Sequence, residues 1–354
     1  ELVVVENAPD GIDATPFDAL VGTAASSDVE AALSKVGPDT IAKILFPSGS
    51  TGVPKGALNT HRMLCSNQQA MVQVWPFIES SPPILLDWLP WNHTFGGNHN
   101  FNMILRNGGA LYIDAGKPTP DQIAATAANL RDIAPTAYFN VPSGYGMLLP
   151  FLEKDAGLRD HFFSRLELIF YAAAALPQNL WERLEKLSIA AIGRKIPMAS
   201  AWGSTETAPL ATSVHFPIDW AGVIGLPVPG CELLLVPNGG KLEVRVRGPN
   251  VTPGYFKQDD LFAESIDEDG FYKIGDAVKF ADPNDPAKGV VFDGRIAEDF
   301  KLATGTFVSV GPLRAKVIAA GAPYIQDVVL TGLNMKEVGA MVFPTPAVRA
   351  LSGL

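Results

Sequence analysis

The chain has 354 residues, of which 47% are hydrophobic, so it can bury a large core and form more than one domain. Its formal net charge of −10 argues against nucleic acid as the main partner, because binding a phosphate backbone requires a basic surface. No apolar run reaches membrane-spanning length and no signal peptide opens the chain, so the sequence predicts a cytoplasmic protein without a membrane span.

The first informative segment is an apolar run at residues 41–46 that leads into a loop of hydroxyl-bearing residues and glycines. The loop reads Pro-Ser-Gly-Ser-Thr-Gly-Val-Pro-Lys-Gly, and a helix is expected to follow from Asn59 or Thr60 to Trp75. A strand, a glycine-rich loop and a helix in this order can hold phosphate groups. The spacing differs from that of the common P-loop. On its own, the segment is compatible with a nucleotide-phosphate clamp or with a polar surface turn.

Downstream, short apolar runs alternate with amphipathic segments. The runs expected as strands cover residues 84–88, 110–113, 136–140, 166–171 and 195–199. Helices are expected over residues 121–131 and 177–187, where apolar residues recur at helical spacing. This alternation predicts an α/β fold with a mostly parallel sheet covered by helices.

After Gly222 the pattern changes to strand-like runs separated by tight turns, at residues 231–236, 241–247, 271–280 and 289–293. These runs predict an antiparallel or barrel-like β subdomain. A helix at 311–320 and strands at 324–330 and 337–343 are expected to begin a small α+β domain. We therefore expect residues 1–295 to form a large domain and residues 296–354 the start of a small one.

Five motifs occur in an order that resembles the adenylate-forming enzymes, a superfamily of acyl-CoA synthetases, peptide-synthetase adenylation domains and luciferases. They are the loop at 48–56, Tyr-Ala-Ala-Ala-Ala-Leu-Pro at 171–177, Trp-Gly-Ser-Thr-Glu at 202–206, and the segments at 247–255 and 269–276. Phe-Asp-Gly-Arg at 292–295 begins the block that leads, in that family, into a small mobile C-terminal domain. The segment 294–311 looks most like the feruloyl-CoA synthetase branch.

The resemblance implies a nucleotide site. Thr51 and Glu206 match residues that hold Mg²⁺, Thr205 matches a donor to the α-phosphate, and Asp276 matches the carboxylate that binds both ribose hydroxyls. Arg295 matches a second ribose contact. The full nucleotide-binding set that it implies is Ser48, Gly49, Ser50, Thr51, Gly52, Lys55, Ala173, Ala174, Ala175, Trp202, Gly203, Ser204, Thr205, Glu206, Asp276, Phe292 and Arg295.

Two carboxylates in this set can also be interpreted without a role in nucleotide binding. Outside its motif, Glu206 would be read as a solvated loop carboxylate. Asp276 follows Gly275 after an alternating strand, so we expect an exposed, directed carboxylate, and the alternative is a turn-initiating aspartate. Trp202 replaces the usual tyrosine, and its indole is expected to stack on adenine.

Catalysis is assigned to four residues, Thr51, Lys55, His93 and Glu206. His93 matches a position between the acyl pocket and the CoA tunnel of the family, although a lone histidine is more often structural. The acyl pocket is expected to use Trp91, His93, Tyr138, Phe139, Ala199, Ala201 and Trp202. These residues are mostly aromatic and suit a planar aryl acid, but a hydrophobic core cluster would look the same.

The resemblance implies an AMP-forming acid–CoA ligase that uses ATP, Mg²⁺ and CoA, with a hydroxycinnamic acid such as ferulic acid as the carboxylic acid. The alternatives are the same chemistry on a benzoate or fatty acid, or a nucleotide-binding fragment without turnover. The sequence leaves a homodimer open. By comparison with the family, we expect a segment before the phosphate loop, and the family's final lysine motif has no match, so the sequence is expected to be truncated. Cys65 and Cys231 are expected as buried free thiols.

Overall fold

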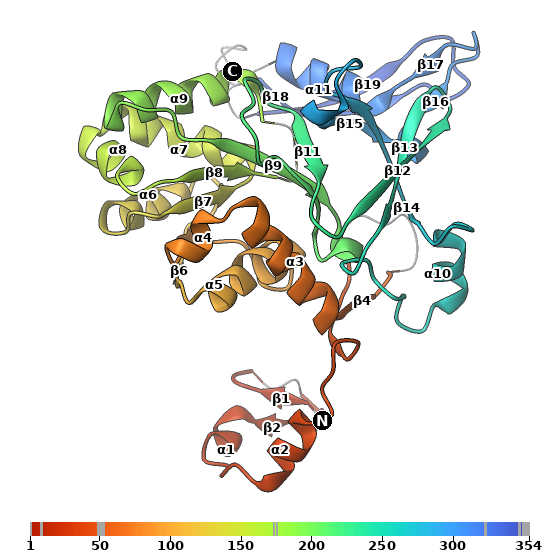
Figure 1. Ribbon diagram of the computed structural model, residues 1–354. Helices are drawn as coiled ribbons and strands as arrows, with labels where there is room; N and C mark the ends of the chain where they lie inside the picture. The colour runs from red at the N-terminus through yellow and green to blue at the C-terminus, as the bar shows by residue number, and fades with distance from the viewer. Residues whose placement is uncertain are drawn as a thin grey trace. The chain divides into compact units, whose positions relative to one another are not determined.

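Figure 1 presents the computed structural model of the chain, which describes residues 2–7, 10–47, 54–172, 174, 176–321, 324–345 and 348. Contacts between residues divide the chain into two compact units, Glu1–Thr40 and Ile41–Leu354. The boundary that we expected after Arg295 is a different division, and it stays a prediction.

The first unit is small, and none of its elements was expected from the sequence. It contains β1 (Val3–Val4), β2 (Thr15–Pro16), α1 (Phe17–Val21) and α2 (Ser27–Leu33). The two strands pair in parallel, and the Ser26 side chain caps α2 by accepting a hydrogen bond from the Asp28 N–H at 3.3 Å. Neither helix has a buried residue, which is why no clear apolar periodicity marks this segment.

The second unit carries the remaining elements. Its strands are β3 (Ile41–Leu45), β4 (Ala57–Thr60), β5 (Ile84–Asp87), β6 (Ala110–Ile113), β7 (Ala137–Asn140), β8 (Leu168–Tyr171), β9 (Met198–Gly203), β10 (Leu210–Ser213), β11 (Val223–Pro227), β12 (Glu232–Asn238), β13 (Lys241–Arg247), β14 (Tyr272–Phe280), β15 (Val290–Arg295), β16 (Phe300–Lys301), β17 (Phe307–Val308), β18 (Ile325–Thr331) and β19 (Gly339–Pro344). Its helices are α3 (His61–Val74), α4 (Phe77–Ser80), the π-helix η1 (Phe95–Phe101), α5 (Asn102–Asn107), α6 (Ile123–Asp132), α7 (Pro142–Lys154), α8 (Ala156–Phe163), α9 (Gln178–Ile192), the 3₁₀-helix η2 (Thr205–Thr207), α10 (Asp259–Ser265), the 3₁₀-helices η3 (Pro286–Lys288) and η4 (Ile296–Glu298), and α11 (Val310–Ala320).

The largest sheet of the described residues has nine strands in the order β12-β13-β14-β15-β11-β10-β9-β8-β7. Strands β7, β8 and β9 are parallel, and the remaining pairs are antiparallel. The predicted change from parallel to antiparallel strands is therefore confirmed, but it comes earlier than expected, between β9 and β10 and before Gly222. The antiparallel strands continue the parallel ones in one mixed sheet. Figure 1 shows α6 to α9 gathered beside β7 and β8.

The parallel strands bury both faces. Phe139 and Phe170 pack into one hydrophobic cluster, together with residues of α3, β5 and η1. Their strand neighbours Tyr138, Ile169 and Tyr171 pack into a second cluster with residues of α6 to α9. This division follows from the period of two along a strand, which sends successive side chains to opposite faces.

The segment after the glycine-rich loop differs from the expectation. The loop joins β3 to β4 in an antiparallel pair, and the helix begins only after β4, so the order is strand, loop, strand, helix. The expected helix start is otherwise confirmed, because the Thr60 hydroxyl caps α3 by accepting from the Met63 N–H at 3.3 Å. On this helix Cys65 is exposed, which corrects the expectation of a buried thiol, whereas Cys231 is buried; both are free.

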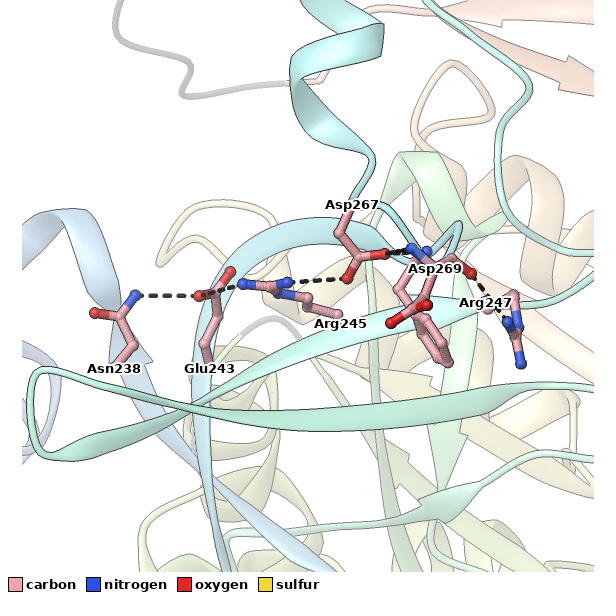
Figure 2. Close-up of polar contacts among 7 residues, drawn as sticks. Asn238, Glu243, Arg245, Arg247, Asp267 and Asp269 are labelled. Carbon is pink, nitrogen blue, oxygen red and sulfur yellow. Dashed lines mark hydrogen bonds and ion pairs between the residues drawn. The ribbon is translucent and has the colours of Figure 1, made fainter.

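A network of charged side chains ties β13 to the turn before β14 (Figure 2). Arg245 donates to Asp267 at 2.9 Å and to Glu243 at 3.4 Å, and Glu243 also accepts from Asn238 at 3.1 Å. Burial acts to raise the pKa of Asp267, but hydrogen bonds from Arg245 and from backbone N–H groups of its own turn outweigh it, so the pKa is lowered. The network thereby holds the start of β14, the strand that carries Asp276.

Candidate functional site

The end of the predicted phosphate loop lies next to a buried tyrosine. Ser48, Gly49, Ser50, Thr51 and Gly52 fall outside the described residues, so their predicted phosphate contacts stay predictions. Lys55 is described, and its ammonium lies 5.5 Å from the centre of the Tyr255 ring. The Gly56 carbonyl accepts from the Phe256 N–H at 2.8 Å, so this end of the loop is joined to the segment that carries Tyr255.

A tight turn after β9 carries Ser204, Thr205 and Glu206. Gly203 is required before it, because a Cβ atom at this position would lie 1.7 Å from the Pro209 carbonyl oxygen. The Ser204 hydroxyl accepts from the Glu206 N–H at 3.2 Å, and the Ser204 N–H donates to the Thr207 hydroxyl at 2.8 Å. The turn is therefore closed by its own hydroxyl groups, as the run of Gly, Ser and Thr suggests.

Buried amide side chains fix the same turn from outside. Asn59 donates to the Thr205 carbonyl at 3.3 Å, and Asn98 donates to the Asn59 side-chain oxygen at 2.6 Å. The Leu210 carbonyl accepts from Asn67 at 2.8 Å and from Asn250 at 2.9 Å. None of these amides was expected from the sequence, because their partners are distant in sequence; the Asn67 to Leu210 bond spans 143 residues.

The Glu206 carboxylate is buried, with 8% of the residue exposed, and a pair of tyrosines contacts it. Tyr255 donates from its hydroxyl to Glu206 Oε1 at 3.0 Å, and the Tyr272 hydroxyl lies 2.7 Å from that of Tyr255. Burial, with the negative charge of Glu206 as the next cause, raises the pKa of both phenols, so the hydroxyls stay protonated at neutral pH. The ordinary reading of Glu206 as a solvated loop carboxylate is thus wrong. The two tyrosines were missed, although Tyr255 ends one of the motifs.

Asp276, Trp202 and Arg295 meet across two parts of the sheet. The Trp202 indole N–H donates to Asp276 Oδ2 at 2.9 Å, and Arg295 Nε lies 3.5 Å from Asp276 Oδ1. Asp276 pairs with Arg295 across β14 and β15, next to a register shift. We expected an exposed carboxylate at a strand end; it is instead buried within β14, with 8% of the residue exposed. Burial raises its pKa, while the Trp202 hydrogen bond and the Arg295 charge act in the opposite direction.

The alanines of the implied nucleotide-binding set are only partly described. Ala174 is exposed, whereas Ala173 and Ala175 fall outside the described residues. Phe292 lies on β15 with 41% of the residue exposed. An exposed aromatic ring three residues before Arg295 leaves a surface on which a planar group can pack.

The expected acyl-pocket residues do not all lie together. Phe139, Ala199 and Trp202 belong to one hydrophobic cluster, and the partly buried Ala201 packs against it. Tyr138 lies in the other cluster, on the opposite face of β7, so it cannot line the same pocket as Phe139. The adjacent positions of these two residues on a strand explain the separation.

Trp91 and His93 lie in the turn just before η1. Trp91 is exposed and its ring centre is 4.9 Å from that of Phe101. His93 Nδ1 accepts from the Phe95 N–H at 3.1 Å, so a neutral ring carries its proton on Nε2. Partial desolvation lowers the pKa of His93, which favours this neutral form. A proton-transfer role for His93 stays a prediction.

Within the described part of the chain, no group of three or more His, Cys, Asp or Glu side chains could hold a metal ion by itself. Glu206 alone offers an oriented carboxylate at the predicted Mg²⁺ site, since Thr51 lies outside the described residues. Mg²⁺ commonly uses one or two carboxylates together with substrate phosphates, so this arrangement fits an ion delivered with a nucleotide. No helix among the described residues has the length and apolarity to cross a membrane.

Comparisons with known proteins agree with this geometry. A CoA ligase of Rhodococcus jostii is 27% identical over 271 residues, covering 76% of this chain and 49% of the relative. A long-chain-fatty-acid–CoA ligase of Escherichia coli is 30% identical over 264 residues, covering 68% and 45%. The chain thus spans about half the length of these curated relatives.

Solved structures give the same fold. A malonyl-CoA ligase in a product complex with methylmalonyl-CoA and AMP is 29% identical, with a TM-score of 0.62 over 88% of this chain and 65% of that one. A family model described as AMP-binding enzyme matches residues 4–256. That match covers the tyrosine-bound Glu206, the Gly203 turn and the Trp202 indole on one side of the site. The chain therefore belongs to the AMP-binding enzyme family.

Proposed function

We propose that this chain provides the nucleotide-binding site of an AMP-forming acid–CoA ligase. The observation that carries the proposal is the convergence of Glu206, Trp202 and Asp276 on one region, where two buried carboxylates have assigned hydrogen-bond donors. The family match and the CoA ligases among the relatives support it. In this reaction an acid carboxylate attacks the α-phosphorus of ATP and releases pyrophosphate. A thiol of CoA then attacks the acyl carbon of the acyl-adenylate and releases AMP.

Different residues would bind the ribose and the adenine of the nucleotide. Asp276 would accept hydrogen bonds from the two ribose hydroxyls; a carboxylate can do this while Trp202 also donates to it, because its two oxygens offer about four lone-pair sites. Arg295 would add the second ribose contact. The Trp202 ring would pack on adenine, together with the backbone of Ala174 and its neighbours in the loop.

At the phosphate end of the nucleotide, positive charges would neutralise the phosphates. Lys55, held over the Tyr255 ring, would neutralise the β- and γ-phosphates, and Thr205 would donate to the α-phosphate. Glu206, with its orienting tyrosine, and Thr51 would hold Mg²⁺, which supplies charge neutralisation when bound. Two anions have to approach each other in the first step, so this charge balance is the main demand on the site.

For the acid, we propose an aromatic carboxylic acid, with a hydroxycinnamate such as ferulate first among the candidates. The aromatic cluster around Phe139 and Phe170 supports an aryl group. The fatty-acid–CoA ligases among the relatives keep an alkyl acid as the alternative.

The test is pyrophosphate release and CoA-thioester formation by the purified protein with ATP and Mg²⁺ across a panel of aryl and alkyl acids. We expect both products with an aryl acid and neither without ATP. AMP binding without pyrophosphate release from any acid would support the nucleotide-binding alternative and reject the ligase assignment.

A further inference from the structure

One buried histidine has no role in the site described so far. His99 lies in η1 with 1% of the residue exposed, and four aromatic side chains pack against it. Its ring centre is 5.3 Å from those of Phe139 and Phe170, 5.7 Å from Phe95 and 6.1 Å from Trp75. These rings belong to the cluster that also holds Ala199 and Trp202, two of the expected acyl-pocket residues. His99 is thus a polar group inside the aromatic region proposed for the acid.

The two ring nitrogens of His99 have different surroundings. Nδ1 lies 2.8 Å from Asn100 Oδ1, and the Asn100 amide donates to Asp87 Oδ2 at 2.8 Å. Because that amide nitrogen faces a carboxylate, its oxygen is left to accept, so Nδ1 of His99 carries the proton. Nε2 is buried and has no hydrogen-bond partner among the described residues.

This arrangement makes Nε2 an acceptor. Burial lowers the pKa of His99 to about 4, with the Asn100 hydrogen bond acting in the opposite direction, so the ring is neutral at pH 7. Burial also raises the pKa of Asp87 to about 6, which still leaves that carboxylate mostly ionised at pH 7 and able to hold Asn100 in place. A neutral imidazole with its proton on Nδ1 offers a lone pair at Nε2. A partner for Nε2 must therefore bring an O–H or N–H donor.

A bound water is a poor partner here. A buried water needs two to four polar contacts, whereas four aromatic rings pack against the His99 ring, and the Gln68 amide donates to the His99 backbone carbonyl at 3.2 Å. The backbone of η1, which carries His99, packs tightly against the preceding segment, since a Cβ atom on Gly96 would lie 2.5 Å from the Pro90 carbonyl oxygen. π-helical turns of this kind occur often at functional sites.

We propose that His99 Nε2 accepts a hydrogen bond from a hydroxyl group on the distal end of an aromatic acid, and so selects hydroxyaryl acids over their unsubstituted counterparts. This inference rests on the proposed function. The aromatic rings would hold the planar ring of the acid by edge-to-face packing, and the buried acceptor would be satisfied only by an acid that carries the donor. His99 is a specificity residue in this proposal and takes no part in bond making.

The experiment compares 4-hydroxycinnamate, cinnamate and 4-methoxycinnamate as substrates and as ligands. The variant is His99→Phe, which keeps a ring and removes the acceptor, and His99→Gln restores an acceptor oxygen. The matched control is His161→Phe on α8, because His161 Nε2 is likewise buried without a partner among the described residues but lies outside the aromatic cluster. Thioester formation gives kcat/KM, and calorimetry gives the Kd of each acid.

We expect the unaltered protein to prefer 4-hydroxycinnamate over cinnamate by at least about tenfold, because a site built around a hydrogen bond rejects the analogue that lacks it. His99→Phe should lower kcat/KM for the hydroxy acid about tenfold more than for cinnamate, His99→Gln should recover part of the preference, and His161→Phe should keep the original ratio. AMP affinity, measured in parallel, reports whether each variant is folded.

Two results would overturn the inference while leaving the ligase assignment intact. One is equal loss on all three acids in folded His99→Phe, and the other is turnover of alkyl acids alone. Failure of the unaltered protein to release pyrophosphate with any acid would count against the proposed function. The calorimetric Kd values would then decide the inference about His99 by themselves. Tighter binding of the hydroxy acid that His99→Phe abolishes would support the inference, and equal Kd values for the three acids would reject it.

Discussion

The substitution Asp276→Ala separates the nucleotide role of the carboxylate from its structural role. In the ligase that we propose, the carboxylate accepts two hydrogen bonds from ribose, and a hydrogen bond to a charged group contributes about 1.5–3 kcal/mol. We take about 3 kcal/mol for the two hydrogen bonds together, because in the free site water makes hydrogen bonds to the same carboxylate. Without them, AMP should bind to the variant roughly 150-fold more weakly than to the unaltered protein. Isothermal titration calorimetry with AMP measures this directly.

The same substitution should change stability less than it changes affinity. It leaves the buried Trp202 N–H without its acceptor, which costs about 1–3 kcal/mol. It also removes a buried carboxylate whose pKa is raised by its burial, and this relief offsets part of the cost. We expect the free energy of unfolding to fall by no more than about 2 kcal/mol.

The pH dependence of this effect has a definite sign. In the folded protein the pKa of Asp276 lies above its ordinary value of 3.8. Between these two pKa values the folded protein binds more protons than the unfolded chain, so this contribution to stability is complete below about pH 4 and is lost as the pH rises through the folded pKa. Asp276→Ala lacks the contribution, so the difference in free energy of unfolding between the unaltered protein and the variant should decrease over that interval.

Asp282→Ala is a suitable control, since Asp282 is a partly exposed carboxylate just after β14 that pairs with Lys288 at 2.7 Å. It should leave AMP affinity unchanged. An unchanged Kd for AMP in folded Asp276→Ala would refute the ribose role. A loss of the same size in Asp282→Ala would indicate a general effect of charge on the acidic chain.

Two further substitutions test the phosphate end and the framework of the site. Glu206→Gln should lower Mg²⁺-dependent turnover about 100-fold while the protein stays folded, because an amide cannot supply the charge that a metal needs; near-normal turnover at saturating Mg²⁺ would contradict this role. Lys241→Met should lower the free energy of unfolding by about 3–5 kcal/mol, because it leaves the buried Asp299 carboxylate without its ion-pair partner. The double substitution Lys241→Met with Asp299→Leu should recover most of the lost free energy of unfolding, measured by chemical denaturation. If the double variant is as unstable as Lys241→Met alone, the loss comes from the packing of the Lys241 side chain and not from the unpaired charge.

The sequence predicted the elements of the sheet better than the contacts of the site. Apolar alternation located β13 over residues 241–247 and predicted a change to antiparallel strands, although that change comes at β10, before Gly222. It placed β9 too early, at 195–199 instead of Met198–Gly203, because the apolar run and the glycine motif read as separate segments although one strand contains both. It also missed β4, whose four residues are too few to display a period.

For the site, motif order predicted the residues and long-range packing decided their surroundings. Trp202 and Asp276 were both expected, but nothing local in either segment indicates that they bond across 74 positions. The same holds for Tyr255 and Glu206, which are 49 positions apart. His99 gave no signal, because a histidine between two asparagines has no periodicity that distinguishes a buried acceptor from a surface loop.

The hydrogen bond between Trp202 and Asp276 gives the tryptophan a second role besides the stacking on adenine that we propose. A tyrosine hydroxyl sits at the far end of its ring, whereas the indole N–H lies on the edge of a larger flat surface. At this position the indole can therefore present its face toward a purine and still donate from its edge to the carboxylate proposed for ribose. The two nucleotide contacts are then mechanically coupled, because the bond that orients the ring also orients Asp276. Since that bond lowers the pKa that burial has raised, it also favours the ionised form that accepts ribose hydroxyls. A replacement that at first looks merely conservative thus has a specific physical consequence for the site.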